Sequence, residues 1–490
     1  MKFDLNTTID RQQLLAKLSQ ALNGGELSAF VGAGISKGAG YFDWKELLKE
    51  EAKDIKLDID KERDLTEVAQ YICNVKNRGT IDNLINEAFP SNLRPNGNHD
   101  LLAKLPIDTF WTTNYDKLIE KALDLNGKTV AVKSEDQHLQ LSRKNHDVVI
   151  YKMHGDIEHP DRAVITRDDY EKYGFKDRVL FRDVLEGHLL TKTFLFIGFS
   201  FTDPNFLAVL SKMRILLDGR NRHHYCILKE ISKEDYLEES EYVYERARQE
   251  LVIEDLKRYG IFVHLIESYS EITDILDTLY KIYRRKTIFI SGSAAEYSPL
   301  PKEIAIDFIQ ELSYQLVCNG YTIINGYGKG IGTHIINGVT RYCYTNRKAK
   351  LENCLSLMPF PLNAGKDQNL KDVWTQYRTE MIEKCGVAIF IFGNKIIDEK
   401  EILIKEELTL KDFISLNYKD KDILLNISNK KLSQLGISAK ILNVSYGAFL
   451  QSIDNYDWYR ISFDEMKEIL EKVNYVNFNE KIEFDRKMIF

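Results

Sequence analysis

The apolar residues of this chain gather into short continuous runs, and segments with helical periodicity separate these runs. A continuous apolar run of four to eight residues is typical of a strand buried on both faces of a sheet. Strands that alternate with helices predict an α/β domain with a mostly parallel sheet. In the first half, such runs cover residues 27–31, 108–114, 148–152, 193–199, 224–228 and 261–265, after an amphipathic helix over residues 11–23.

A second alternating series begins directly after the basic residues 284–286. Its expected strands cover residues 287–290, 321–324, 355–359 and 387–392, with helices over residues 304–318 and 373–385. No repeat or low-complexity linker separates the two series. We therefore predict two Rossmann-like α/β domains, residues 1–285 and residues 286–490, with a further helix near the C-terminus over residues 463–473.

The composition is that of a globular protein, and it narrows the classes of function. The 490 residues are 44% hydrophobic and 29% charged, and the net charge of −7 argues against a broad basic surface for nucleic acid. No apolar run approaches the ~20 residues of a membrane-spanning helix, and residues 1–11 are polar, which predicts a cytoplasmic protein. The six cysteines form no CxxC pair, so we expect neither a zinc ribbon nor a thioredoxin-type site.

Four predicted strand ends in the first half carry polar residues or glycines. In an open parallel sheet, ligands bind beyond the carboxyl ends of the strands. Gly32 and Gly34 would let a phosphate approach backbone N–H groups, Asn114 could hold ribose hydroxyls or orient a water, and His154 could accept a proton. Ser200, Asp203 and Asn205 could contact phosphate and a second ribose.

Each of these signals also has an ordinary structural explanation. The glycines could form a plain tight turn, Asn114 could cap the next helix, and a single histidine is more often structural than catalytic. The segment around Asp203 could be a Thr-Asp-Pro-Asn turn. The four signals are stronger together than apart, because all fall on predicted strand ends of one α/β unit.

The same segments resemble the ordered NAD-binding motifs of sirtuins. The matching motifs are Ala33-Gly34-Ile35-Ser36, Thr113-Asn114-Tyr115-Asp116, His154-Gly155-Asp156 and Gly198-Phe199-Ser200. The similarity is greater to the sirtuin domain of the Thoeris antiphage defence effectors, and it covers about residues 27–265. This resemblance implies that Asn114 and His154 are the catalytic pair. It implies contacts with NAD⁺ for Ala33, Gly34, Ser36, Asp116, Gly198, Ser200, Asp203 and Asn205.

The activity implied by the resemblance is hydrolysis of NAD⁺ to nicotinamide and ADP-ribose. Nicotinamide is a cationic leaving group, so help comes from fixing the ribose, partly deprotonating a hydroxyl and positioning a water. Two other functions stay open. The chain could be a nucleotide-binding sensor without catalysis, or a zinc-free deacylase, although deacylating sirtuins carry a four-cysteine zinc module that this sequence cannot build.

In the second half, glycines occupy every second position from Gly326 to Gly332, directly after a predicted strand. Such density suggests backbone amides wrapped around an anion. Arg378 and Lys395 could meet phosphates, although Arg378 taken alone fits a surface salt bridge with Glu380 or Glu383.

This half resembles the SLOG domain, the nucleotide sensor of Thoeris effectors. The resemblance implies a homotetramer activated by a cyclic ADP-ribose isomer that a partner TIR-domain protein makes. Asp412 is the best candidate for an acidic ligand of the family, with Glu406 or Glu407 as alternatives. The implied activator-binding residues are Ser291, Gly292, Ser293, Gly328, Gly330, Gly332, Arg378, Lys395 and Asp412.

Overall fold

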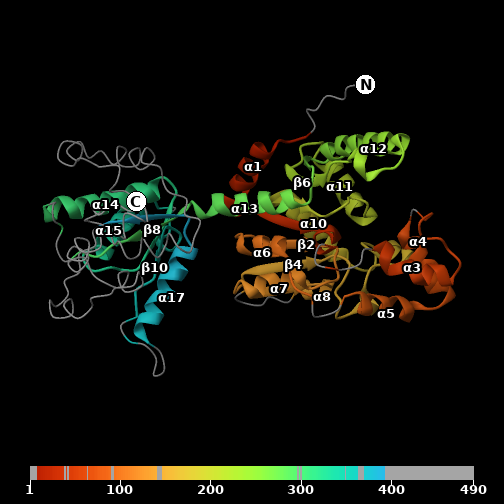
Figure 1. Ribbon diagram of the computed structural model, residues 1–490, viewed down its shortest axis with the longest axis horizontal. Helices are drawn as coiled ribbons and strands as arrows, with labels where there is room; N and C mark the ends of the chain where they lie inside the picture. The colour runs from red at the N-terminus through yellow and green to blue at the C-terminus, as the bar shows by residue number, and fades with distance from the viewer. Residues whose placement is uncertain are drawn as a thin grey trace, which may run out of the picture. The chain divides into compact units, whose positions relative to one another are not determined.

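The computed structural model describes residues 8–391, except for residues 38–39, 41–43, 63, 90–92, 141–145, 295–296, 298–300, 348, 362 and 364–368. The chain divides into two compact units, Met1–Tyr280 and Lys281–Phe490. Each unit has its own parallel sheet (Figure 1). The expected helix over residues 463–473 lies outside the described residues.

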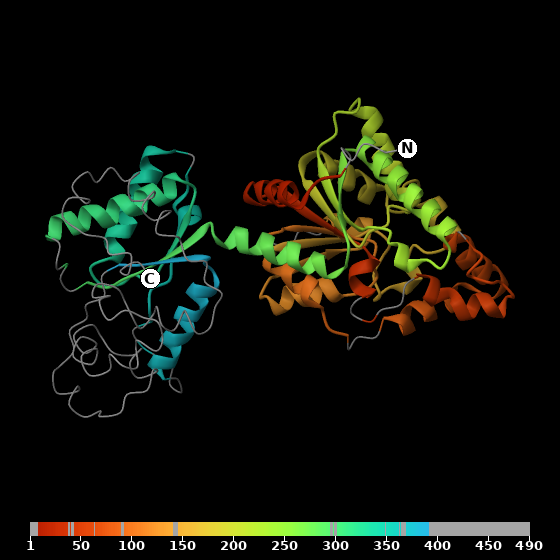
Figure 2. The same cartoon turned by 45° about the horizontal axis from the view of Figure 1, so that its top comes forward.

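The first unit contains a seven-stranded sheet in the order β3-β4-β2-β1-β5-β6-β7, and all its strand pairs are parallel. Helices lie on both sides of this sheet (Figures 1 and 2). The strands are β1 (Leu27–Val31), β2 (Thr109–Thr112), β3 (Val130–Lys133), β4 (Val148–Lys152), β5 (Thr193–Ile197), β6 (His224–Lys229) and β7 (Ile261–Ile266).

The central strands are buried on both faces, which explains their continuous apolar runs. Every residue of β1, β2 and β5 is buried. Phe30 of β1 packs with the rings of Phe196, Phe199 and Phe206 at centroid distances of 5.3, 4.6 and 5.0 Å. This aromatic cluster is the core beside the central strands, and it holds the chain that follows β5 against β1.

Three helices of the first unit form a separate group with its own apolar core. These are α3 (Trp44–Asp54), α4 (Leu65–Val75) and α5 (Arg78–Ala88), which lie together at one end of the unit (Figure 1). The other helices are α1 (Arg11–Asn23), α2 (Ala33–Lys37), α6 (Gly97–Lys104), α7 (Leu118–Leu125), α8 (Asp136–Gln140), α9 (Arg167–Lys172), α10 (Val179–Thr191), α11 (Pro204–Leu216) and α12 (Glu239–Arg258), with short 3₁₀ turns at Pro160–Arg162 and Lys233–Asp235. Helix α13 (Ser270–Arg284) begins in the first unit and ends in the second.

Four neighbouring strands end at the same level of the sheet. Val31 is paired with both Thr112 and Ile197, and Thr112 is paired with Lys152. The chain leaves β1 for β2 on one side and later returns to β5 on the other side. Such a reversal of strand order is where α/β sheets place their ligands, so this edge is the candidate site.

The second unit contains a four-stranded parallel sheet in the order β10-β9-β8-β11. Ile288 and Ile290 of β8 pack in the core with α14 and α15, whereas Phe289 packs in a cluster with α17. The elements are β8 (Thr287–Ser291), α14 (Lys302–Cys318), β9 (Thr322–Asn325), α15 (Gly332–Thr345), α16 (Leu351–Cys354), β10 (Leu355–Leu357), α17 (Leu370–Glu383) and β11 (Val387–Phe390).

The predicted fold class is confirmed, because both units are α/β with parallel sheets. Strand β3 is absent from the prediction. Its four residues show a mixed burial pattern at the edge of the sheet, so they produce no continuous apolar run. Within the part of the chain that the structure describes, no helix has the length and apolar character needed to cross a membrane.

A buried lysine ties two of the loops at the candidate edge. The side chain of Lys152, at the end of β4, has 0% exposure, and its Nζ lies 2.6 Å from Asp156 Oδ2 and 2.8 Å from Glu120 Oε1. The same Nζ donates to the backbone carbonyls of Tyr115 and Asp116 at 3.2 and 2.6 Å. Burial alone would lower the pKa of Lys152, but the interactions with Glu120 and Asp156 outweigh this effect and raise the pKa.

We expect Lys152→Met to destabilise the first unit strongly. The change leaves two buried carboxylates without a counter-ion, which costs about 3–5 kcal/mol of unfolding free energy. The measurement is the urea midpoint of unfolding. The control is Lys117→Met, which removes a partly exposed lysine paired with exposed Glu158 and should cost less than about 1 kcal/mol. Equal midpoints for the two variants would contradict the role of Lys152.

Candidate functional site

Two glycine segments meet by direct backbone contact at the edge of the first sheet. The Gly34 N–H donates to the Gly198 carbonyl at 3.0 Å. A Cβ on Gly32 would lie 2.2 Å from that carbonyl oxygen, and Gly198 has a φ of +65°. Glycine is therefore required by the approach of the two loops. The prediction of a tight glycine turn and the prediction of a ligand loop both fit this geometry.

Three predicted site residues form one hydrogen-bonded chain. Asn114 Nδ2 donates to Ser36 Oγ at 3.0 Å, and Ser36 Oγ donates to Asp116 Oδ2 at 2.8 Å. All three side chains are buried. Asp116 Oδ1 also accepts from the Leu118 N–H at 2.9 Å at the start of α7. The alternative in which Asn114 caps the next helix is therefore wrong, because Asp116 takes that contact at the start of α7 and also orients Ser36.

His154 lies beside Asp203 rather than alone. Its Nε2 is 2.9 Å from Asp203 Oδ2, at ion-pair distance but out of hydrogen-bond alignment. The Tyr170 hydroxyl donates to the same carboxylate oxygen at 3.2 Å, and the Tyr170 ring meets the His154 ring edge-on at 5.5 Å between centroids. His154 is 3% exposed, so its ring has little freedom.

Asp203 is charged in this environment in spite of its burial. Burial alone would raise the pKa of this carboxyl. The interaction with the adjacent His154 imidazole, the Phe206 N–H and the Tyr170 hydroxyl overcome that effect and hold the pKa of Asp203 below its ordinary value. In contrast, burial and the nearby Asp203 charge raise the pKa of Tyr170 far above its ordinary value, so Tyr170 remains a donor.

Asn114 and His154 occupy equivalent places on neighbouring strands. Each lies two residues beyond the paired positions Thr112 and Lys152. Buried Asn114 Oδ1 and Asn205 Nδ2 have no hydrogen-bond partner among the described residues. An unpartnered buried polar atom costs free energy that a ligand hydrogen bond recovers, so these atoms fit a polar substrate.

The other predicted residues of this site are spread over the same edge. Ala33 and Gly34 are exposed at the start of α2, and Ser200 is exposed, with its hydroxyl 2.8 Å from that of Thr202. Asp203 caps α11 through the Phe206 N–H at 2.7 Å. The segment around Asp203 thus forms the turn expected from the structural alternative, and Asp203 in addition contacts His154.

Sequence reasoning missed Lys152 and Tyr170. Lys152 ends an apolar strand and precedes an aspartate by four residues, which is a signal for a buried ion pair. Tyr170 lies on α9, far from any strand end, and no pattern in the sequence connects it with Asp203. Among the described residues, no group of three or more His, Cys, Asp or Glu side chains is arranged to hold a metal ion.

The glycines of the second unit also have a packing role. A Cβ on Gly328 would lie 1.9 Å from the Gly292 carbonyl oxygen, and one on Gly330 would lie 2.3 Å from the Ala294 carbonyl oxygen. Ala294 N–H donates to the Lys329 carbonyl at 2.8 Å. The loops after β8 and β9 therefore lie side by side at the carboxyl edge of this sheet, where Ser291 ends β8 and Ser293 lies in the loop that follows it.

Arg378 lies on α17, with its guanidinium carbon 5.4 Å from the centre of the Phe360 ring. Burial lowers the pKa of this arginine. The alternative of a salt bridge with Glu380 or Glu383 is not seen among the described residues, where no carboxylate pairs with Arg378. The two other predicted ligands, Lys395 and Asp412, lie outside the described residues.

Two family models match the chain in agreement with its two units. Residues 108–250 match a SIR2-like domain, and residues 271–475 match the Sir2- and TIR-associating SLOG family. The first match contains the segments that carry Asn114, His154 and Asp203. The second contains the glycine loop after β9 and Arg378.

Similar whole proteins extend the likeness over almost the entire chain. The NAD(+) hydrolase ThsA of Enterococcus faecium is 42% identical over 432 residues, which cover 86% of this chain and 88% of the relative. The protein of the same name from Cytobacillus dafuensis is 37% identical, over 96% of this chain and 94% of the relative. The one from Bacillus cereus is 43% identical, over 75% of this chain and 76% of the relative. The chain belongs to the ThsA family of NAD(+) hydrolases.

Proposed function

We propose that this chain hydrolyses NAD⁺ to nicotinamide and ADP-ribose at the edge of the first sheet. The observation that carries the proposal is the buried His154–Asp203 pair, in which His154 lies two residues beyond the end of β4 and level with Asn114. A histidine held by a carboxylate is an arrangement suited to proton transfer. The NAD(+) hydrolases that are similar over most of the chain support the choice of substrate.

The proposed roles follow from the contacts of each side chain. Asp203 faces His154 Nε2, so the neutral ring carries its proton there and keeps the Nδ1 lone pair as the base for a ribose hydroxyl or a water. Asn114 is oriented by Ser36 and offers Oδ1 to the substrate. Fixing the ribose and assisting loss of a proton lower the barrier to departure of nicotinamide.

The remaining NAD⁺-binding residues belong to the same proposal. Cleavage places positive charge on the ribose, and the carboxylates of Asp116 and Asp203 lie at the edge where that charge would develop. The proposed substrate contacts beside the catalytic pair are Ala33, Gly34, Ser36, Asp116, Gly198, Ser200, Asp203 and Asn205. We propose that no metal takes part.

We propose that the second domain, residues 286–490, senses a cyclic ADP-ribose isomer and switches on the first, residues 1–285. The adjoining glycine loops and the partly buried Arg378 support an anion site. A TIR-domain protein would supply the nucleotide, and the active form would be a homotetramer in the cytoplasm, where NAD⁺ depletion would serve antiphage defence. The proposed ligands are Ser291, Gly292, Ser293, Gly328, Gly330, Gly332, Arg378, Lys395 and Asp412.

The catalytic pair is tested by removing each side chain. We expect His154→Ala and Asn114→Ala to lower nicotinamide release by roughly 10³-fold, because each removes a group that acts on the reacting ribose. Release is measured with and without cyclic ADP-ribose isomers, and thermal unfolding checks the fold. Retained turnover in both variants would overturn the assignment. Nicotinamide release that requires an acyl-lysine peptide would instead indicate a deacylase.

The role of Asp203 is tested with a nearly isosteric change. We expect Asp203→Asn to lower kcat by about 100-fold or more, because the amide cannot stabilise the protonated imidazole. Asparagine also caps helices well, so α11 should keep its N-terminus. Asp161→Asn, at an exposed carboxylate, is the control and should keep full activity. Equal kcat for both variants would exclude Asp203 from the mechanism.

The sensor is tested with two arginines that both lie over aromatic rings. We expect Arg378→Ala to raise the activating concentration of the cyclic nucleotide by about 10- to 100-fold, the value of a lost charge-assisted hydrogen bond. Arg341→Ala is the control, since Arg341 lies over Tyr314 and pairs with Glu311 on the surface. An unchanged activation curve in Arg378→Ala would show that Arg378 does not contact the activator.

A further inference from the structure

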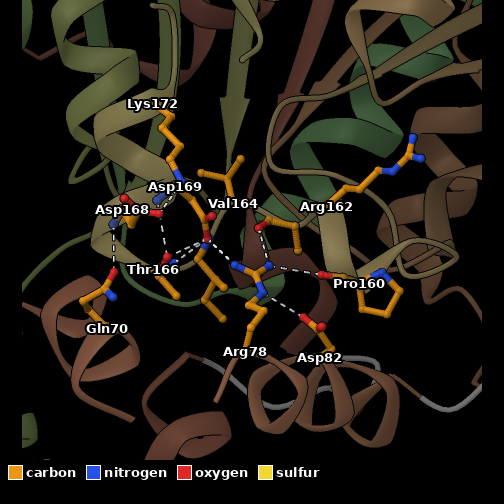
Figure 3. Close-up of polar contacts among 12 residues, drawn as sticks. Gln70, Arg78, Asp82, Pro160, Arg162, Val164, Thr166, Asp168, Asp169 and Lys172 are labelled. Carbon is orange, nitrogen blue, oxygen red and sulfur yellow. Dashed lines mark hydrogen bonds and ion pairs between the residues drawn. The ribbon is translucent and has the colours of Figure 1, made fainter. Parts of the chain in front are cut away.

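Arg78, the first residue of α5, makes contacts in several directions at once (Figure 3). Its Nε donates to Asp82 Oδ1 at 2.8 Å, and its Nη1 donates to Asp169 Oδ2 at 2.6 Å. Its Nη2 donates to the carbonyls of Pro160 and Ala163 at 3.2 and 2.8 Å. The side chain is 28% exposed. All three nitrogens of the guanidinium are therefore used.

Asp169 connects Arg78 to the backbone of residues 165 and 166. Its Oδ2 also accepts from the N–H groups of Ile165 and Thr166, at 3.2 and 2.9 Å, and from the Thr166 hydroxyl at 2.8 Å. Arg78 and Asp169 together fix the shape of residues 160–169. A planar fork with fixed donor directions can hold two carbonyls and a carboxylate at once, which a single ammonium group cannot reproduce.

The segment that Arg78 holds, residues 160–169, is hydrogen-bonded to the backbone of the proposed catalytic histidine. The Val164 N–H donates to the His154 carbonyl at 2.8 Å, and the Val164 carbonyl accepts from the Tyr115 hydroxyl at 2.8 Å. Tyr170 follows Asp169 in the chain and donates to Asp203, which faces His154. Arg78 therefore has two short routes to His154, one through Val164 and one through Tyr170.

We infer that Arg78 is a positioning residue for the catalytic histidine, through which the helical group α3–α5 sets the geometry of the NAD⁺-cleaving edge. This inference rests on the proposed NAD⁺ hydrolysis. Arg78 touches no reacting atom. It fixes the backbone behind His154 and the tyrosine that orients Asp203, and small displacements of reacting groups are costly in rate.

The test compares Arg78→Lys with Arg167→Gln in the full chain. Arg167 also joins α9 to the helical group, through Glu67, but its side chain is 55% exposed and touches neither the Pro160 nor the Ala163 carbonyl. We expect Arg78→Lys to lower kcat by about 10- to 100-fold with KM changed by less than about threefold. Arg167→Gln should keep the wild-type kcat. Nicotinamide release is measured with a panel of cyclic ADP-ribose isomers.

Two further readouts separate positioning from a loss of stability. Hydrogen exchange of the Val164 amide should become faster in Arg78→Lys and stay unchanged in Arg167→Gln. In the Asp203→Asn background, Arg78→Lys should cost less kcat than it does alone, since both act partly on one histidine. A wild-type kcat in Arg78→Lys would overturn the inference. So would fully additive kcat losses for Arg78→Lys and Asp203→Asn together with an unchanged hydrogen-exchange rate at Val164. A wild-type chain that releases no nicotinamide with any isomer would instead refute the proposed function, and the Val164 exchange would still report on Arg78.

Discussion

The positive charge of Lys152 has to be balanced inside the protein, because its side chain reaches no solvent. Asp156, Glu120 and the backbone carbonyls of Tyr115 and Asp116 provide that balance. Asp156 and the two carbonyls come from the two loops that carry the proposed catalytic pair, and Glu120 comes from α7. An unpaired charge at this depth would cost several kcal/mol, so the two loops are held at a fixed spacing. The positions of Asn114 and His154 follow from this constraint and from the common level at which β2 and β4 end.

Both units join their glycine loops in the same way. In the first unit Gly32 and Gly34 lie against Gly198, and in the second Gly328 lies against Gly292. In each case a side chain would collide with a backbone carbonyl, so glycine is needed for packing whether or not a ligand is bound. This close approach also leaves backbone groups near the carboxyl edge of the sheet, which is where an α/β fold binds nucleotides. Packing and ligand binding therefore favour the same residue type at these positions.

The sequence predicts the strands well where both faces are buried, as in Leu27–Val31 and Thr193–Ile197, because burial leaves a continuous apolar run. It fails for Val130–Lys133 at the sheet edge, where burial is mixed. Strand ends point to Asn114 and His154. They do not show that Asp203 faces His154 or that Arg78 holds the segment behind it, because those contacts join elements far apart in the chain. Local patterns identify elements and their ends, whereas contacts between loops depend on how the elements pack.

The polar groups of the first site differ in what they offer a substrate. Ser36 and Asp116 are already hydrogen-bonded to each other, so a ligand must compete with an existing bond. Asn114 Oδ1 and Asn205 Nδ2 have no partner among the described residues, and each such buried atom carries a penalty of about 1–3 kcal/mol. A ribose hydroxyl or an amide that pairs with them recovers that free energy. The paired groups thus hold the shape of the site before binding, and the unpaired ones supply part of the affinity for a polar, hydroxyl-rich substrate.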